Sequence, residues 1–222
     1  MADIFNEIDE ELRQEKLRKA WDRYGVLLLA AAALIVLGVA AWRGWDYHQT
    51  IRAREQGDAF AAAEQMMKAG DQKGAEAAFL ALSKSSNGGY PMLAALRAAS
   101  TLAETGEAAK ALEAFDALAK APATPALLAD IARVRAAWLA VDIEDRPTFE
   151  ARVAPLAVGN APFRHAAREL LALSAWKAGD LAAVTKRIEE IDADPETPRG
   201  LSERASILAA LVRAHTPSGK AN

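Results

Sequence analysis

One uncharged apolar stretch constrains this chain more than any other feature. From Gly25 to Trp42 the sequence is GVLLLAAAALIVLGVAAW, eighteen residues without a charged side chain, and Tyr24 extends it by one. A helix of this length lies at the short end of what crosses about 30 Å of hydrocarbon. The stretch predicts a transmembrane helix over residues 24–44, whose residues include Gly25, Leu28, Leu34, Ile35, Leu37 and Trp42.

Aromatic residues bracket this stretch. Five of the eight Trp and Tyr residues flank it, namely Trp21, Tyr24, Trp42, Trp45 and Tyr47. Such residues are enriched where a membrane meets water. The alternative, a buried core helix, normally carries polar residues along one face, and this stretch has none. The bracket therefore favours a membrane span.

A cleaved signal peptide is a second alternative, because Val39-Ala40-Ala41 resembles a small-residue cleavage site. A signal peptide begins with a short basic segment, whereas some two dozen residues with seven acids precede this stretch. Leu and Ile also continue almost to its far end. We therefore expect an uncleaved anchor.

The distribution of Lys and Arg predicts the orientation of the anchor. Five basic residues lie just before the span and three follow it at a similar distance, namely Arg13, Lys16, Arg18, Lys19 and Arg23 against Arg43, Arg52 and Arg54. Because Lys and Arg favour the cytoplasmic side, we expect a cytoplasmic N-terminus. The C-terminal part is then periplasmic in a Gram-negative host, and the anchor lies in the inner membrane.

The segment before the span, residues 1–23, has apolar residues four apart, namely Ile4, Ile8 and Leu12, then Leu17 and Trp21. This spacing predicts a short amphipathic helix. The helix either binds a membrane surface or a partner, or is a solvated extension, and the sequence leaves both open. After the span, residues 45–55 are expected to form a juxtamembrane linker.

Composition favours an all-α fold for the rest of the chain. Alanine is abundant and aromatic residues make up only 6%, which suits close-packed helices better than strands. The formal net charge is −3 and no basic face is clustered, so the pattern of a nucleic-acid-binding protein is missing. The absence of cysteine excludes disulfides, thiolate metal sites and a cysteine nucleophile.

A short pattern recurs after the span. It reads Lys-Ala-Gly-Asp at Gly70 and Gly179, with a close variant at Gly106. Gly106 follows Gly70 by 36 residues and Gly179 follows Gly106 by 73, about twice that, so a copy without glycine is expected near Asp142. Gly-[Asp/Glu]-x3-Ala-x3-Phe occurs twice in register, and Val184 and Ile188 take the Ala and Phe positions in the last copy.

This pattern predicts helical hairpins. Gly ends the first helix in a conformation that other residues resist, Ala allows two helices to approach closely, and Phe fills the space toward the next hairpin. Such units must stack to bury their apolar faces. The residues expected to form this packing are Gly70, Ala75, Phe79, Gly106, Ala111, Phe115 and Gly179.

Helix limits follow from Gly and Pro positions. The predicted pairs are 52–69 with 73–83, 91–105 with 108–120, 125–141 with 147–156, and 163–178 with 181–191. Pro155 should end or kink its helix early. A capping helix begins near Leu201, and the tail, residues 216–222, is expected to be disordered.

The period and its Gly-acid, Ala and Phe positions resemble the tetratricopeptide repeat (TPR) in degenerate form, over about Gln56 to Ile191. Ala99 and Leu102 stand where that repeat has Trp and Tyr in its first helix. The resemblance implies a TPR-like α-solenoid of about four helical hairpins plus a capping helix, in a domain at residues 56–215.

With its span, the whole chain resembles the YfgM-type ancillary subunits of the bacterial SecYEG translocon. The match lies in the arm and span, in Arg43-Gly44-Trp45-x-Tyr47-His48-Gln49, and in the start of the second hairpin, Gly89-Tyr90-Pro91-Met92-Leu93-Ala94-Ala95-Leu96. The resemblance implies a periplasmic scaffold that associates with the translocon and with a membrane-anchored chaperone or prolyl isomerase.

No catalytic, cofactor or metal constellation is visible in the sequence. His48, His165 and His215 lie far apart, and His165 is expected to pack or to cap a helix start. Asp192-x-Asp194 lacks the Gly and distal Glu of a calcium loop, so a turn before Pro195 is expected.

The sequence therefore favours a non-catalytic scaffold that binds a protein segment, and a membrane-tethered enzyme has no support. Arginines on first helices are the candidate contact residues, namely Arg97, Arg133, Arg135 and Arg168. The alternative is a self-assembling structural TPR protein of the cell envelope or division machinery, in which the repeats form homo-oligomers.

Overall fold

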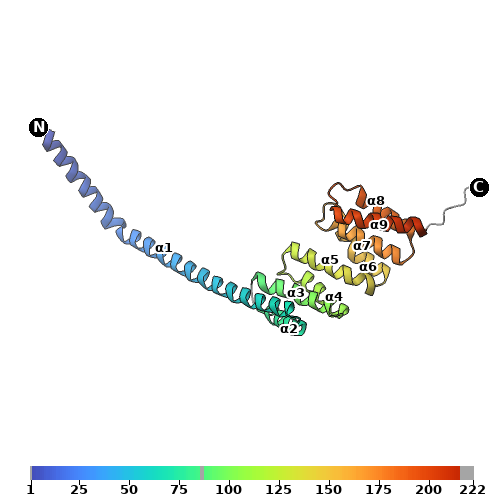
Figure 1. Ribbon diagram of the computed structural model, residues 1–222. Coiled ribbons are helices and arrows are strands. Elements are labelled where there is room, and N and C mark those ends of the chain that lie inside the picture. Colours follow the sequence, from blue (N-terminus) through green and yellow to red (C-terminus); the bar gives the residue numbers. More distant parts are fainter. Residues whose placement is uncertain (1, 86–87, 216–222) are drawn as a thin grey trace, which may run out of the picture. The chain divides into compact units, whose positions relative to one another are not determined.

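The computed structural model describes residues 2–85 and 88–215, with side chains described from Arg18 onward except Ala20. These residues are all-α without a strand, as the sequence predicted, and the chain divides into two compact units, Met1–Glu55 and Gln56–Asn222. The described helices are α1 (Ala2–Lys68), α2 (Gln72–Ser83), α3 (Gly89–Glu104), α4 (Ala108–Lys120), α5 (Ala126–Ile143), α6 (Arg146–Val153), the 3₁₀ helix η1 (Ala154–Leu156), α7 (Arg164–Lys177), α8 (Leu181–Asp192) and α9 (Arg199–His215) (Figure 1).

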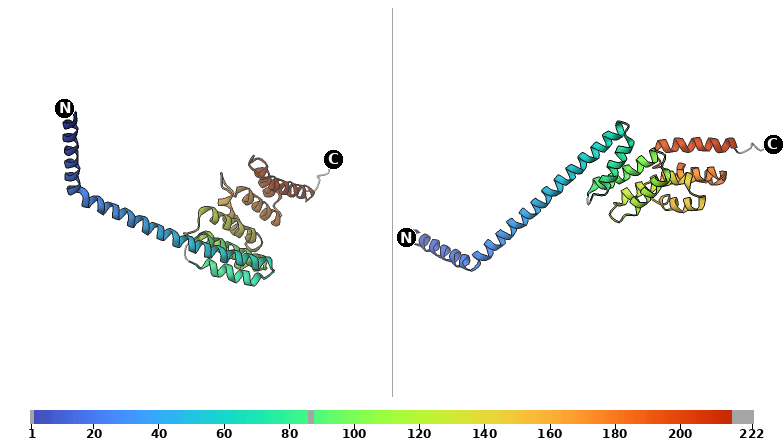
Figure 2. Two further views of the ribbon diagram at one scale, coloured as in Figure 1. Left: turned by 60° about the vertical axis from the view of Figure 1, so that its left-hand side comes forward. Right: turned by 90° about the horizontal axis from the view of Figure 1, so that it is seen from below.

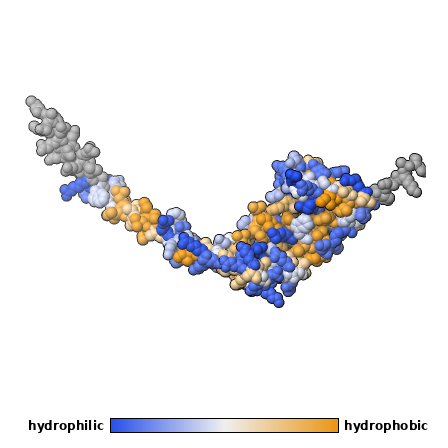
Figure 3. Space-filling model, in the orientation of Figure 1, coloured by the Kyte–Doolittle hydropathy of each residue, from blue (hydrophilic) through white to orange (hydrophobic). Residues whose placement is uncertain are grey.

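The first unit is the part of α1 that ends at Glu55. Among the described helices, α1 alone is long and apolar enough to cross a membrane. Its apolar residues from Val26 to Val39 are exposed, and they form the orange stretch of α1 in Figure 3. Most of the predicted span residues share this exposure, namely Leu28, Leu34, Ile35, Leu37 and Trp42.

Gly25 differs from its neighbours in the span because it is buried. A Cβ added there would lie 3.2 Å from the Trp21 ring, so the indole covers this glycine. Residues 45–55, which we expected to be a linker, are helical. Of the side chains that define the amphipathic face of the arm, Trp21 is described, whereas Ile4, Ile8, Leu12 and Leu17, and the tail at 216–222, lie outside the described residues.

The second unit is built from antiparallel helix pairs (Figures 1 and 2). The end of α1 pairs with α2, α3 with α4, α5 with α6 and α7 with α8, and α9 packs last against α7 and α8. This is the predicted arrangement of four hairpins and a capping helix. Alanine supplies much of the core, which allows neighbouring helices to approach closely.

Three of the hairpins turn at a glycine. Gly70, Gly106 and Gly179 have φ of 86°, 86° and 73°, a left-handed conformation that residues with a Cβ rarely adopt. An acidic residue follows each glycine and stands at the N-cap of the next helix. Two of these acids accept hydrogen bonds, at 2.9 Å from the amide of Gly74 and 3.0 Å from that of Ala183.

Buried residues lie four and eight positions after each N-cap acid. In the first, second and fourth hairpins the smaller of these two residues precedes the larger. All six side chains are buried: Ala75 and Phe79, Ala111 and Phe115, Val184 and Ile188. The four-residue interval places both members on the face of the second helix that meets its neighbours.

The third hairpin keeps this arrangement with different residues. Without a glycine, α5 continues to Ile143 and ends at Glu144 in an extended conformation, with φ −89° and ψ 155°. The N-cap acid is Asp145, which accepts a hydrogen bond of 2.9 Å from the Thr148 amide, so this copy begins three residues after Asp142. Phe149 and Val153 are its two buried residues, with the larger one first.

Pro155 has the effect that the sequence predicted. The α-helix ends at Val153, and Pro155 lies in the 3₁₀ helix that follows. The second helix of this hairpin is therefore short, because α6 has 8 residues where α4 has 13.

Candidate functional site

Two apolar pockets on the repeat unit share the side chain of Trp138, which lies on α5 and is 41% exposed. The first has a volume of about 510 Å³ and lies among α3, α4, α5 and the residue before α7. The second has a volume of about 330 Å³ and lies among α5, α7, α8 and α9. We call the two pockets together the Trp138 groove.

The first pocket combines an apolar lining with three polar side chains. Phe115 of α4 is buried behind it. Ser100, Glu104 and Arg135 supply the polar groups, and the rest of the lining is apolar: Ala103, Ile131, Val134, Trp138, Leu139 and Phe163. This pocket can take an apolar side chain together with a polar or charged group.

The second pocket is more uniformly apolar. Its two charged residues, Glu169 and Arg204, bind each other. The apolar lining is Trp138, Ala172, Leu173, Ile188, Ile191, Ala205, Ile207, Leu208 and Leu211. Ile207 is 63% exposed, which is unusual for so large an apolar residue. This pocket is suited to apolar side chains of a partner.

Two arginine–glutamate pairs join neighbouring first helices of the repeats. Arg97 of α3 binds Glu64 of α1 through two hydrogen bonds, and one of them measures 3.0 Å. Arg204 of α9 binds Glu169 of α7 at 2.5 and 2.8 Å. The hydrogen bonds to these glutamates raise the pKa of both arginines. These bidentate pairs fix the distance between consecutive helices.

Between α3 and α5 the corresponding contact has no carboxylate. Arg135 donates a hydrogen bond of 3.2 Å to the Ser100 hydroxyl, and this is its one partner among the side chains that the structure describes. The guanidinium lines the first pocket beside Trp138. An exposed positive charge therefore stands at the edge of an apolar surface.

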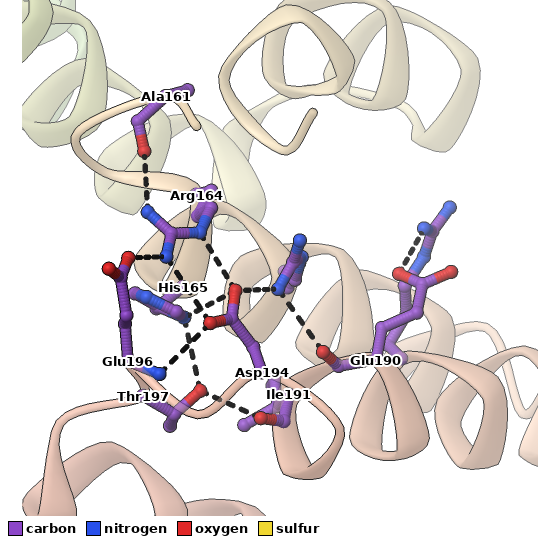
Figure 4. Close-up of polar contacts among 10 residues, drawn as sticks. Ala161, Arg164, His165, Glu190, Ile191, Asp194, Glu196 and Thr197 are labelled. Atoms are coloured by element: carbon purple, nitrogen blue, oxygen red, sulfur yellow. Dashed lines mark hydrogen bonds and ion pairs between the residues drawn. The ribbon is translucent and has the colours of Figure 1, made fainter. Parts of the chain in front are cut away.

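A buried polar cluster holds the connection between α8 and α9 against α7 (Figure 4). Arg164 binds Asp194 at 2.8 and 3.2 Å and also pairs with Glu196. Arg168 adds a bond of 2.9 Å to Asp194 and one of 3.1 Å to the Glu190 carbonyl. The Arg164 guanidinium holds the pKa of Asp194 far below its ordinary value. The charged aspartate thus fixes the start of α9, which forms one wall of the second pocket.

His165 and Thr197 complete this cluster. The Nδ1 atom of His165 lies 3.1 Å from the Thr197 hydroxyl, which donates a hydrogen bond of 2.7 Å to the Ile191 carbonyl (Figure 4). Burial, together with the charge of Arg164, lowers the pKa of His165. The Glu196 amide also donates a bond of 3.1 Å to Asp194, which forms a turn around Pro195. These contacts fix a loop and leave no open coordination site around Asp194.

The four arginines singled out from the sequence fall into two groups. Arg97 and Arg168 are held in pairs within the fold, and the Arg168 side chain is only 14% exposed. Arg133 and Arg135 are exposed on α5, where Arg133 pairs with Asp130 one turn away. Of the four, Arg135 alone lines the Trp138 groove.

The sequence interpretation did not single out Trp138, Ile207 or Leu211. Apolar residues lie on all sides of α5, so spacing does not distinguish the buried face from the exposed one. The available signal was the size of Trp138, because alanine occupies all buried positions of this helix except that of Val134, namely Ala129, Ala132, Ala136, Ala137 and Ala140.

Among the side chains that the structure describes, no group of three or more His, Asp or Glu residues is arranged to hold a metal ion. Of the charged residues at the groove, Glu169 and Arg204 bind each other, and Arg135 binds a hydroxyl.

A family model described as tetratricopeptide repeat-like domain matches residues 18–154. No curated protein and no solved structure gives a significant match. The matched residues are more than half of the chain and include the first three hairpins, whereas the fourth hairpin and α9 lie beyond them. By this match and its helical repeats, the chain belongs to the tetratricopeptide repeat-like domain family.

Proposed function

We propose that the protein is a non-catalytic, membrane-anchored scaffold whose Trp138 groove binds a segment of a partner polypeptide. The apolar stretch of α1, residues 24–44, is the anchor. The N-terminus lies in the cytoplasm, and the repeat domain lies in the periplasm of a Gram-negative cell.

The observation that carries this proposal is the meeting of two apolar pockets at the exposed Trp138. Soluble surfaces rarely leave large apolar residues exposed side by side unless they bind something. Binding hot spots are rich in Trp and Arg, and they lie in pockets from which water is displaced. Trp138, Ile207 and Arg135 have these properties.

The repeat architecture supports a scaffold in preference to an enzyme. TPR-like domains typically mediate protein–protein interactions. Of the described charged residues that line the groove, Glu169 and Arg204 are engaged in a pair that holds α7 to α9. The anchor confines the binding event to a membrane surface, where a partner that is itself membrane-bound meets the groove at high effective concentration.

The partners that we propose are subunits of the SecYEG translocon and a membrane-anchored periplasmic chaperone or prolyl isomerase. This proposal rests on the resemblance of the span, its aromatic exit and the second hairpin to the YfgM-type subunits. The scaffold then assists the translocation or folding of emerging chains.

Site-directed photocrosslinking in intact Gram-negative cells tests this function. A benzoylphenylalanine at Ile207, inside the groove, is compared with one at Leu127, which is 60% exposed on α5 but lines neither pocket. We expect adducts with translocon subunits or a folding factor from position 207 alone. Equal adducts from both positions, or none from position 207, would contradict the proposal.

The self-assembly alternative has its own outcome in the same experiment. The Ile207 adduct would then contain a second copy of this chain, and the full chain in detergent would sediment as an oligomer. These two results would support a structural assembly in place of the scaffold. Protease access in spheroplasts checks the orientation, because a periplasmic repeat domain is cleaved before the cells are lysed.

A further inference from the structure

Three contacts between first helices of the repeats differ in one respect. Arg97 and Arg204 each bind a glutamate with two hydrogen bonds, whereas Arg135 reaches only the Ser100 hydroxyl. All three contacts join residues 33 to 35 positions apart, about one repeat length. The groove therefore contains the one arginine of this series whose charge is not balanced by a carboxylate of the fold.

The chemistry of the guanidinium makes this difference important. An arginine stays charged at any physiological pH and presents five N–H donors in a planar fork that matches a carboxylate. The Ser100 hydroxyl accepts one of these bonds and carries no charge. The remaining donors of Arg135 are free to bind a group that enters the first pocket.

Glu104 is the acid that lines the same pocket. It forms no ion pair with Arg135 among the described side chains. Glu104 lies on α3 together with Arg97. The hydrogen bond to Glu64 and, to a lesser degree, the charge of Glu104 raise the pKa of Arg97. Glu104 thus lowers the positive potential of the pocket without occupying the donors of Arg135.

The second pocket has no such imbalance, because Arg204 and Glu169 bind each other and the rest of the lining is apolar. The two pockets are therefore suited to bind different groups, an apolar side chain in the second pocket and an anionic group in the first. Trp138 lies between them and contacts both.

We infer that the segment bound in the Trp138 groove carries an Asp or Glu side chain close to a large apolar one, and that Arg135 binds the carboxylate. This inference rests on the proposed function and specifies the chemistry of its partner. Arg135 thereby acts as a specificity residue, and Trp138 with the second pocket supplies most of the affinity.

Peptide selection on the full chain in lipid nanodiscs tests the inference. Random peptides displayed on phage are selected on the wild type after removal of those that bind empty nanodiscs. We expect selected sequences to combine Asp or Glu with Leu, Phe or Trp. A selected peptide and its counterpart with each acid replaced by the amide are then compared by fluorescence anisotropy.

Three variants separate the roles of the charges. Arg135→Gln should weaken binding of the acidic peptide about fivefold, which corresponds to about 1 kcal/mol for an exposed charged contact. Binding of the amide counterpart should not change. Glu104→Gln should strengthen binding of the acidic peptide. Arg133→Gln is the matched control, because Arg133 is exposed on the same helix and lines neither pocket, and it should change nothing.

The outcomes distinguish this inference from the proposed function. If acidic and amide peptides bind equally, or if Arg135→Gln has no effect, the inference is wrong. The proposal that the groove binds a polypeptide is still supported if Trp138→Ala weakens the binding of these peptides. If no peptide is selected, or if Trp138→Ala weakens the binding of none, both the inference and the proposal that the groove binds a polypeptide are wrong.

Discussion

The second and third hairpins solve the same packing problem with different residues. In the second, Gly106 makes the turn, and Ala111 and Phe115 are the buried pair. In the third, an extended Glu144 replaces the glycine, and the buried pair is Phe149 and Val153. The repeat therefore preserves the positions that are buried, whereas the order of large and small residues changes.

The irregular hairpin also contributes the side chain that both pockets of the groove share, Trp138. Its first helix carries Trp138 and Arg135, and the chain after its shortened second helix brings Phe163 to the first pocket. Arg97 and Arg204 each bind a glutamate, whereas Arg135 of the irregular hairpin binds the Ser100 hydroxyl of the second hairpin.

The largest expected effect is that of emptying the core of the third hairpin. Phe149→Ala should lower the free energy of unfolding by about 3–5 kcal/mol, as for other buried phenylalanines, because the side chain is 1% exposed. Phe115→Ala in the second hairpin is the matched variant, and urea unfolding of the full chain in nanodiscs measures both. A much smaller loss at Phe149 would show that the third hairpin is loosely packed.

The turn glycine of the second hairpin should have the next largest effect. Gly106→Ala forces an alanine into φ 86°, which costs about 1–2 kcal/mol of stability. Gly200→Ala is the control, because Gly200 is helical with open space at its Cβ, and it should leave stability unchanged or raise it slightly. Thermal unfolding followed by circular dichroism compares the two, and equal losses would contradict the role of the turn.

The arginine contacts should separate stability from binding. Arg97→Gln breaks a bidentate pair with Glu64 and should cost about 1 kcal/mol. Arg135→Gln loses only a hydrogen bond to a hydroxyl and should cost close to nothing, although it weakens acidic peptides. A loss of stability at Arg135 as large as that at Arg97 would assign both residues to packing.

The smallest effect concerns pH. Hydrogen bonds from Thr148 hold the pKa of Asp145 below its ordinary value, so its contribution to stability is complete above about pH 3.9 and is lost as the pH falls further. Asp145→Asn keeps an N-cap that does not titrate. The advantage of wild type over this variant should shrink below about pH 4, and a difference that is constant with pH would contradict the cap.

Much of the fold was predictable because its signals are local. A glycine followed by an acid marks the turn in three hairpins, at Gly70, Gly106 and Gly179, all with positive φ, although Gly57-Asp58 lies inside helix α1. The end of α5 was less sharply predicted because no glycine marks it, and the helix continues to Ile143, two residues beyond the expected end at 141. Pro155, by contrast, acts through its own ring, and the helix ends where the sequence placed the break.

The groove was less predictable because it depends on residues far apart in the chain. Ile207 of α9 and Trp138 of α5 meet only after the fourth hairpin has stacked between them. The role of Arg135 depends on the identity of Ser100 one repeat earlier, and charge counting within one helix does not reveal it. The cluster around Asp194 likewise joins α7 to a loop some 30 residues later.

The central claim is that Trp138 anchors a bound polypeptide, and the most direct measurement is the yield of the Ile207 photocrosslink in a Trp138→Ala background. Trp138 is partly exposed, so the variant should remain folded, whereas loss of a binding hot spot should reduce the yield by at least about tenfold. A folded variant that crosslinks as well as the parent would contradict the claim.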